Sequence, residues 1–472
     1  MSNSVSADGG AGAKARPGHA RGSSLSDGIN TITSPSGPRG PEDPAVAGIA
    51  DALGASGNPS QDVAVTPAAK GKAKSKSKKK GKMVIDDGVD RSSKGLLRDL
   101  ITFRWMTVPA SSFKIAFTLA AVYLTLEFVP GFSGTNNPLA PLVRISHRVP
   151  LTSVLAAEPS LIGEALTAPI HSGVSPTETP SAIRYQKGYQ DLAFVAYYIV
   201  VFSFIRQAST QYLFRPFALW WGIRNERKLE RFVEQGYAML YWGTAGALGL
   251  YVMSFQESWW YNLEHLWLKY PHWQMRPELK AYYLLQLSYW LQQALVMILR
   301  LEAPRKDYYE LIVHHLVTLW LIFWSYLINL TMIGTTVFVA MDVPDTFLAL
   351  SKALSYMGIE AITMPVFAIF MVVWTYFRIY ESARTLWSVW FQFDLIPEHT
   401  KEWNPPQGWW MVWWMKYQVF APLFILLCLN LFWYFLMWRI MIRALAGGPA
   451  EDEREEGEYE EEEAEKEKAK SK

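Results

Sequence analysis

Long apolar runs recur along the 472-residue chain and restrict its fold more than any other feature. The hydrocarbon core of a bilayer is about 30 Å thick, so a helix needs about 20 mostly apolar residues to cross it. We therefore predict an all-α polytopic membrane protein with about eight transmembrane helices. These helices are expected near residues 113–129, 190–205, 237–255, 280–299, 308–328, 333–356, 362–381 and 416–438.

The charges of the connecting segments predict how the chain crosses the membrane, since short cytosolic loops carry an excess of Lys and Arg. Four basic segments alternate with less basic ones, so eight spans put all four on one side and both termini in the cytosol. The opposite segments, 130–189, 257–273 and 398–416, include Trp-rich stretches typical of the membrane interface. The basic side chains are Lys94, Arg98 and Arg104; Arg206, Arg215, Arg224, Arg227, Lys228 and Arg231; Arg300, Arg305 and Lys306; and Arg439 and Arg443.

The two ends of the chain have the composition of tails. Residues 1–90 are rich in Gly, Ser, Ala, Pro and Lys and lack the apolar core of a signal peptide, so we expect a disordered cytosolic tail. Residues 91–189 are expected to hold the first span and a luminal loop. Residues 441–472 are expected to form an acidic and basic cytosolic tail whose last residues, KAKSK, fit an endoplasmic reticulum retrieval signal.

Two adjacent histidines, His314 and His315, interrupt the apolar run 308–328. The next run carries Asp342 and Asp345, and an antiparallel hairpin returns these carboxylates to within about 10 Å of the depth of the histidines. An aspartate at mid-bilayer costs about 2.5–3.5 kcal/mol, so both should face protein or water. A buried structural network would explain the four residues, but ionisable groups inside a membrane favour a functional site.

Neighbouring helical residues point about 100° apart, so one histidine can meet a substrate while the other makes a helix contact. An imidazole oriented by a carboxylate suits general-base or nucleophilic chemistry. A metal site is disfavoured, because the chain has eight histidines and only this pair is clustered. We therefore expect no metal.

From residue 314 to 352 the sequence resembles the Lag1 motif of ceramide synthases, which share a six-helix TLC domain. The wider resemblance covers roughly 190–440, and it implies a TLC-type bundle that encloses a substrate cavity. Met332, Met341 and Ala349 depart from the pattern of many animal members, whereas MDVPD at 341–345 resembles the fungal branch. The residues that match the motif are His314, His315, Thr318, Ser325, Tyr326, Asn329, Gly334, Asp342, Asp345, Leu348 and Lys352.

The resemblance implies an enzyme that transfers a fatty acyl group, which can be of very long chain, from acyl-CoA to the amine of a sphingoid base. With dihydrosphingosine or phytosphingosine, the product is a dihydroceramide or phytoceramide. The basic loops 206–231 and 300–306 could receive the CoA, which is a co-substrate and not a permanently bound cofactor. Membrane lipids and a small single-span regulatory subunit or a second copy are the expected partners, and nucleic acid is not.

The implied catalytic residues are His314, His315, Asp342 and Asp345, and the implied substrate-binding residues are Ser325, Tyr326, Asn329 and Lys352. Two mechanisms are open: a histidine deprotonates the amine for direct attack, or it accepts the acyl group first. We expect His314 to act, with Asp345 orienting it. The alternatives are a non-enzymatic lipid-sensing or translocation-associated member of the same fold, and a transporter.

Overall fold

The structure is a computed structural model that describes residues 95–150, 153, 183–301 and 307–446. The chain divides into Met1–Ile85 and Asp86–Lys472, and every described residue belongs to the second unit. The predicted tail 1–90 and most of the predicted tail 441–472 lie outside the described residues. So do the retrieval signal and the basic residues Arg305 and Lys306.

The described residues form helices joined by loops, with only isolated β-bridges, and this confirms the all-α prediction. Six helical stretches are long and apolar enough to cross a membrane. They are α2 (Pro109–Glu127), α6 (Gln190–Ala208) continued through a π-helical turn (Ser209–Phe214) into α7 (Arg215–Trp221), α10 (Tyr308–Leu327), α11 (Thr331–Tyr356), α12 (Glu360–Trp374) continued through η8 (Thr375–Glu381) into α13 (Ser382–Phe391), and α14 (Met415–Leu445).

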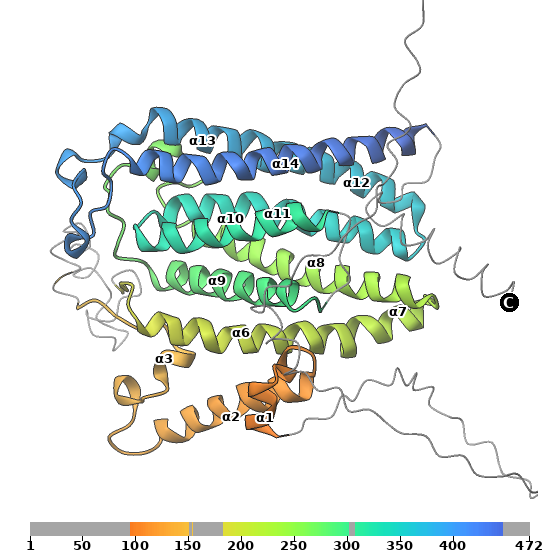
Figure 1. Cartoon of the computed structure of the whole chain (residues 1–472), viewed down its shortest axis with the longest axis horizontal. Coiled ribbons are helices and arrows are strands. Elements are labelled where there is room, and N and C mark those ends of the chain that lie inside the picture. The colour runs from red at the N-terminus through yellow and green to blue at the C-terminus, as the bar shows by residue number, and fades with distance from the viewer. Residues whose placement is uncertain (1–94, 151–152, 154–182, 302–306, 447–472) are drawn as a thin grey trace, which may run out of the picture. The chain divides into compact units, whose positions relative to one another are not determined.

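Two more predicted spans fall on helices of spanning length, α8 (Glu226–Met253) and α9 (Pro277–Ile298). Their sequences are too polar for them to be identified as spans by hydropathy. Several of their polar side chains lie inside the protein. Arg231 and Glu234 of α8 and Gln293 of α9 line an internal pocket, and Gln286 of α9 is buried. All eight predicted runs therefore correspond to helices, and α8 and α9 run alongside the others in the bundle (Figure 1).

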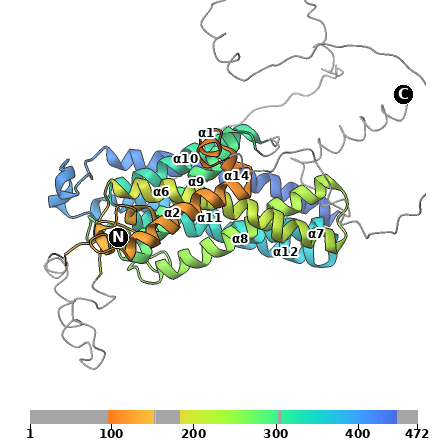
Figure 2. The same ribbon diagram turned by 90° about the horizontal axis from the view of Figure 1, so that it is seen from below.

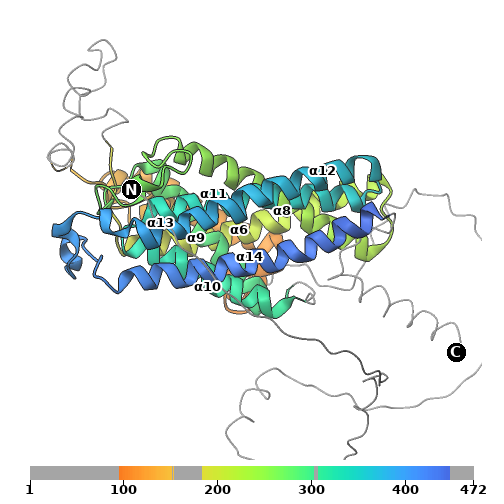
Figure 3. The same ribbon diagram turned by 90° about the horizontal axis from the view of Figure 1, so that it is seen from above.

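The helices of residues 226–445 form the main bundle, in which α8 and α12 pack against α11, and α10 packs against α14. Helix α6 lies between α9 and α2, which is at the margin of the bundle (Figures 1 and 2). Seen from above, on the side opposite to Figure 2, α14 and the α12–α13 stretch run side by side along the bundle (Figure 3). Two short helices, α1 (Leu96–Ile101) and α3 (Ala140–Val143), flank α2 and α6.

Three predicted helices end later than expected, because the runs 190–205, 362–381 and 416–438 continue as helices to Trp221, Phe391 and Leu445. The first two helices contain Arg206 and Arg378, which point to an internal pocket instead of lipid, so the charge does not end the helix. Both helices contain a π-helical turn at or just after the charged residue, a feature often found at functional sites.

One glycine is required by helix packing. A Cβ on Gly334 of α11 would lie 1.5 Å from the hydroxyl of Tyr283 on α9, so no larger residue fits unless the tyrosine moves. This close approach brings the α9 side chains against α11, the helix that carries the two aspartates.

Candidate active site

A large polar pocket lies at the end of the bundle that contains the C-terminal end of α6 and the N-terminal end of α8. It encloses about 1690 Å³ of empty space, part of it open to solvent. Its lining includes the motif residues His314, His315, Asp345 and Lys352. Five basic residues face three acidic ones in the lining, so the pocket favours an anionic ligand. The basic residues are Arg206, Arg231, Arg300, Lys352 and Arg378, and the acidic ones are Glu234, Asp307 and Asp345.

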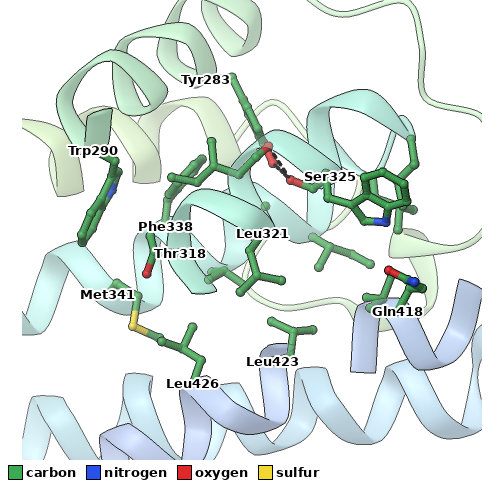
Figure 4. A pocket seen from close by; sticks show the side chains of 18 of the residues that line it. Tyr283, Trp290, Thr318, Leu321, Ser325, Phe338, Met341, Gln418, Leu423 and Leu426 are labelled. Atoms are coloured by element: carbon green, nitrogen blue, oxygen red, sulfur yellow. Dashed lines mark hydrogen bonds between the residues drawn. The ribbon is translucent and has the colours of Figure 1, made fainter. Parts of the chain in front are cut away.

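A second pocket of about 650 Å³ lies deeper among α9, α10, α11 and α14 and is almost entirely apolar (Figure 4). Trp290 and Met341 lie toward one end and Gln418 toward the other, with Leu321, Leu423 and Leu426 between them (Figure 4). Apolar walls of this kind suit a hydrocarbon chain.

The two histidines have different hydrogen-bonding states. His315 donates from Nδ1 to the backbone oxygen of Leu311 at 2.9 Å, which leaves Nε2 of a neutral ring as an acceptor. His314 is 7% exposed, and its Nδ1 has no hydrogen-bond partner. The ring centroids are 5.8 Å apart and the planes nearly perpendicular, at 87°. Although the two rings diverge, both reach the polar pocket.

Asp345 is paired with an arginine that we did not predict. Nη2 of Arg378 donates to Oδ2 of Asp345 at 2.5 Å and to the backbone oxygen of Met341 at 2.9 Å. Nη1 donates to Oδ1 of Asn430 at 3.2 Å, and the guanidinium carbon lies 4.2 Å from the centroid of the Trp374 ring. The hydrogen bond that we expected Asp345 to make to a histidine is thus made to Arg378 instead.

Asp342 faces the other pocket. Its Oδ2 accepts a hydrogen bond from Nε2 of Gln286 at 2.6 Å, and the side chain is 1% exposed. Gln286 in turn accepts from the hydroxyl of Tyr241 at 2.8 Å and donates to that of Tyr282 at 3.0 Å. The i, i+3 spacing predicts that the two aspartates share a helix face. In the structure they diverge, because Asp342 turns to α9 and Asp345 turns to η8.

The four implied substrate-binding residues separate into three groups. Lys352 lines the polar pocket with the histidines. Ser325 lines the apolar pocket, where its hydroxyl lies 2.5 Å from that of Tyr283 (Figure 4). Tyr326 and Asn329 line neither pocket. They hold the helices together.

Tyr326 donates to Oδ2 of Asp191 on α6 at 2.8 Å. Asn329 occupies the α10–α11 turn with φ of 63°, donates to the backbone oxygen of Gly408 at 3.0 Å and accepts from Nζ of Lys187 at 2.9 Å. Burial lowers the pKa of Lys187 to about 8. The hydrogen bonds of Asn329 thus connect the C-terminal end of α10 to the segment before α6 and to the loop before α14.

Sequence reasoning missed Arg378, Gln286 and Trp290. A signal was present for Arg378, because an arginine inside an apolar run is as unusual as an aspartate. Gln286 and Trp290 carry no such signal, since only the packing of α9 on α10 and α11 brings them to the site. Within the described ranges, no cluster of three or more potential ligands could hold a metal.

The sequence profile of the TLC domain family matches residues 231–439, which hold α8 to α14 almost completely. The chain is 40% identical over 273 residues to Sphingosine N-acyltransferase lac1 of Schizosaccharomyces pombe, covering 58% of this chain and 70% of that protein. It is 34% identical over 340 residues to Ceramide synthase LAG1 of Saccharomyces cerevisiae, covering 72% and 74%. It is 27% identical over 291 residues to Ceramide synthase LOH1 of Arabidopsis thaliana, covering 57% and 91%.

These relatives are named as enzymes, which favours an enzyme over the non-enzymatic alternative. All three matches extend over more than two thirds of the relative, so the similarity is not confined to the histidine motif. The chain therefore belongs to the Lag1 family of TLC-domain ceramide synthases and is a multi-pass membrane N-acyltransferase.

Proposed function

We propose that this enzyme transfers a fatty acyl group from acyl-CoA to the amine of dihydrosphingosine or phytosphingosine, and that His314 and His315 carry out the transfer. The observation that carries the proposal is the position of the two histidines. They line a basic pocket, and Trp290, which contacts both rings, also lines a deeper apolar one.

The two pockets match the two halves of acyl-CoA. The CoA half is a polyanion, and the basic lining of the polar pocket would attract it. The acyl half is a hydrocarbon chain, and the apolar pocket offers it walls from four helices. An acyl-CoA placed in this way has its thioester near the boundary of the pockets, beside the histidines.

The two rings suit two consecutive roles. In the first step a nitrogen of His314 attacks the thioester carbon, a C–N bond forms, the C–S bond breaks and CoA leaves as a thiolate that takes up a proton. In the second step the sphingoid amine attacks the acyl-imidazole, the amide C–N bond forms, the C–N bond between the acyl carbon and His314 breaks, and the released ring nitrogen takes up a proton. His315, whose Nδ1 donates to the backbone oxygen of Leu311, takes the proton that the amine must lose.

The aspartates would support these steps from opposite sides. Asp345 neutralises Arg378 beside the histidines and keeps the guanidinium in place. Asp342 offers carboxyl oxygens at the margin of the apolar pocket, where an incoming amine would find a hydrogen-bond acceptor.

We further propose that the enzyme resides in the endoplasmic reticulum membrane with both termini in the cytosol. The clustering of basic residues at one end of the bundle supports this orientation. The polar pocket then opens toward the cytosol, where acyl-CoA is available.

An assay of the purified protein tests the proposal. Acyl-CoAs of increasing chain length are supplied with dihydrosphingosine or phytosphingosine, and amide product and free CoA are measured. With acyl-CoA alone, the acyl-enzyme route predicts a burst of one CoA per enzyme. His314→Ala should abolish both the burst and the product, whereas His399→Ala, an exposed histidine outside both pockets, should change neither. Product formation by His314→Ala would refute the proposed site.

A further inference from the structure

Trp290 of α9 occupies the boundary between the two pockets. It is 7% exposed, and of the residues that line either pocket it alone lines both. Its ring centroid is 5.5 Å from that of His314 and 5.5 Å from that of His315, with the rings edge to face. Figure 4 shows the side chain at one end of the apolar pocket.

The indole N–H of Trp290 is buried and has no hydrogen-bond partner. Buried donors are almost always paired, because an unpaired one loses its bond to water without replacement. Other buried indoles in the described part of the chain also lack partners, but none of those is in ring contact with His314 or His315. Trp433 also contacts His314, but its N–H is already donated to Asp307.

Thr318 provides a second unused donor at the same end of the apolar pocket. It follows His314 by one helical turn, lines that pocket, and its buried hydroxyl has no partner. Figure 4 shows it near Trp290 and Met341. Helical threonines usually donate to the backbone oxygen four residues earlier. Thr335, Thr346, Thr363, Thr375 and Thr385 of this protein all do so, at 2.7–3.0 Å.

Two unpaired donors beside the reacting histidines have the arrangement that acyl transfer requires. When a nitrogen attacks the thioester carbon, the C=O π electrons move onto the oxygen. Donors already placed around that oxygen stabilise the tetrahedral intermediate without reorganisation. The charge is removed when the C=O bond re-forms and the C–S bond breaks.

We propose that the indole N–H of Trp290 and the hydroxyl of Thr318 form the oxyanion hole of this enzyme. Both donate to the carbonyl oxygen of the thioester as it becomes an oxyanion, and again when the amine attacks the acyl group. This assignment rests on the proposed acyl transfer at His314. It makes Trp290 and Thr318 catalytic residues in addition to the histidines and aspartates.

Two substitutions that each remove one donor test the assignment. Trp290→Phe removes the N–H and keeps an aromatic ring, and Thr318→Val removes the hydroxyl and keeps the branched shape. Loss of one oxyanion donor typically lowers kcat by about 10²- to 10³-fold. We expect a fall of at least about 10²-fold for each variant, with KM for acyl-CoA unchanged.

Matched controls separate catalysis from folding. Trp105→Phe removes another buried, unpaired indole N–H, and Thr363→Val removes a helical hydroxyl, both outside the two pockets. Both controls should keep the wild-type kcat. An S-alkyl-CoA thioether has no carbonyl oxygen, so it should inhibit the wild type, Trp290→Phe and Thr318→Val with the same inhibition constant.

The outcomes distinguish this inference from the proposed function. If His314→Ala is inactive but Trp290→Phe and Thr318→Val keep a kcat within threefold of the wild type, the oxyanion hole is refuted and the histidine site stands. A changed inhibition constant for the thioether, with unchanged kcat, would make the residues part of the chain-binding wall and also refute it. If Trp290→Phe fails to fold, Thr318→Val decides alone.

Discussion

Replacing Arg378 by methionine would leave the Asp345 carboxylate inside the bundle without its cation. The two side chains are 4% and 13% exposed, and their closest N–O distance is 2.5 Å. Removing one partner of a buried ion pair costs about 3–5 kcal/mol, because the remaining charge stays buried without compensation. Arg378→Met alone and Asp345→Asn alone should therefore each lower the free energy of unfolding by about 3–5 kcal/mol.

The double variant Arg378→Met with Asp345→Asn contains no unpaired charge at this position. Its loss should be similar to that of either single variant and far below their sum, so the cycle should give a coupling energy of about 3–5 kcal/mol, which is the loss of one single variant. Unfolding in mixed micelles with increasing SDS would measure the four free energies, independently of catalytic activity.

An exposed pair provides the control for this cycle. Lys401 and Glu398 are 2.7 Å apart, but Glu398 is 85% exposed, so Lys401→Met should cost no more than about 1 kcal/mol. If the effects of Arg378→Met and Asp345→Asn simply add, the two residues do not act as a pair, and the reasoning about the polar pocket is wrong.

Three further predictions concern the helix contacts around the site. Burial lowers the pKa of Lys187 from its usual 10.5 to about 8. Between these two pH values the unfolded state therefore binds more protons than the folded state, so the folded state becomes more stable as the pH rises. The melting temperature of the wild type should rise from pH 8 to 10, and that of Lys187→Met should rise less. Gln286→Leu removes the amide that donates to Asp342 and should cost about 1–3 kcal/mol in the same SDS titration; an unchanged midpoint would contradict this. Gly334→Ala places a methyl group against the Tyr283 hydroxyl and should lower the melting temperature, whereas adding Tyr283→Phe should restore part of the loss; no restoration would refute the contact.

Hydropathy was sufficient to predict the helices but not all of their ends. The criterion fails where a charged residue lies inside a bundle, as Arg206 does directly after the predicted run 190–205, since the cost of placing a charge in lipid does not apply there. The polar helices α8 and α9 follow the same rule. Their composition reflects the pocket that they line.

The histidines and aspartates could be placed at similar depth from the sequence alone, because a hairpin of two antiparallel helices fixes how far each residue lies from the turn. Which groups they meet could not be predicted. Helix rotation and the arrangement of α9, η8 and α14 around the hairpin decide that Asp345 meets Arg378 and Asp342 meets Gln286.

The sequence by itself determined the membrane class, the helical segments and the motif that identifies the family, since these depend on local composition and spacing. Only the tertiary structure decided that the two aspartates face different pockets and that Trp290 lies between those pockets. The physical reason is that a pocket is lined by side chains from several helices. Their contacts depend on how those helices pack, which no single segment specifies.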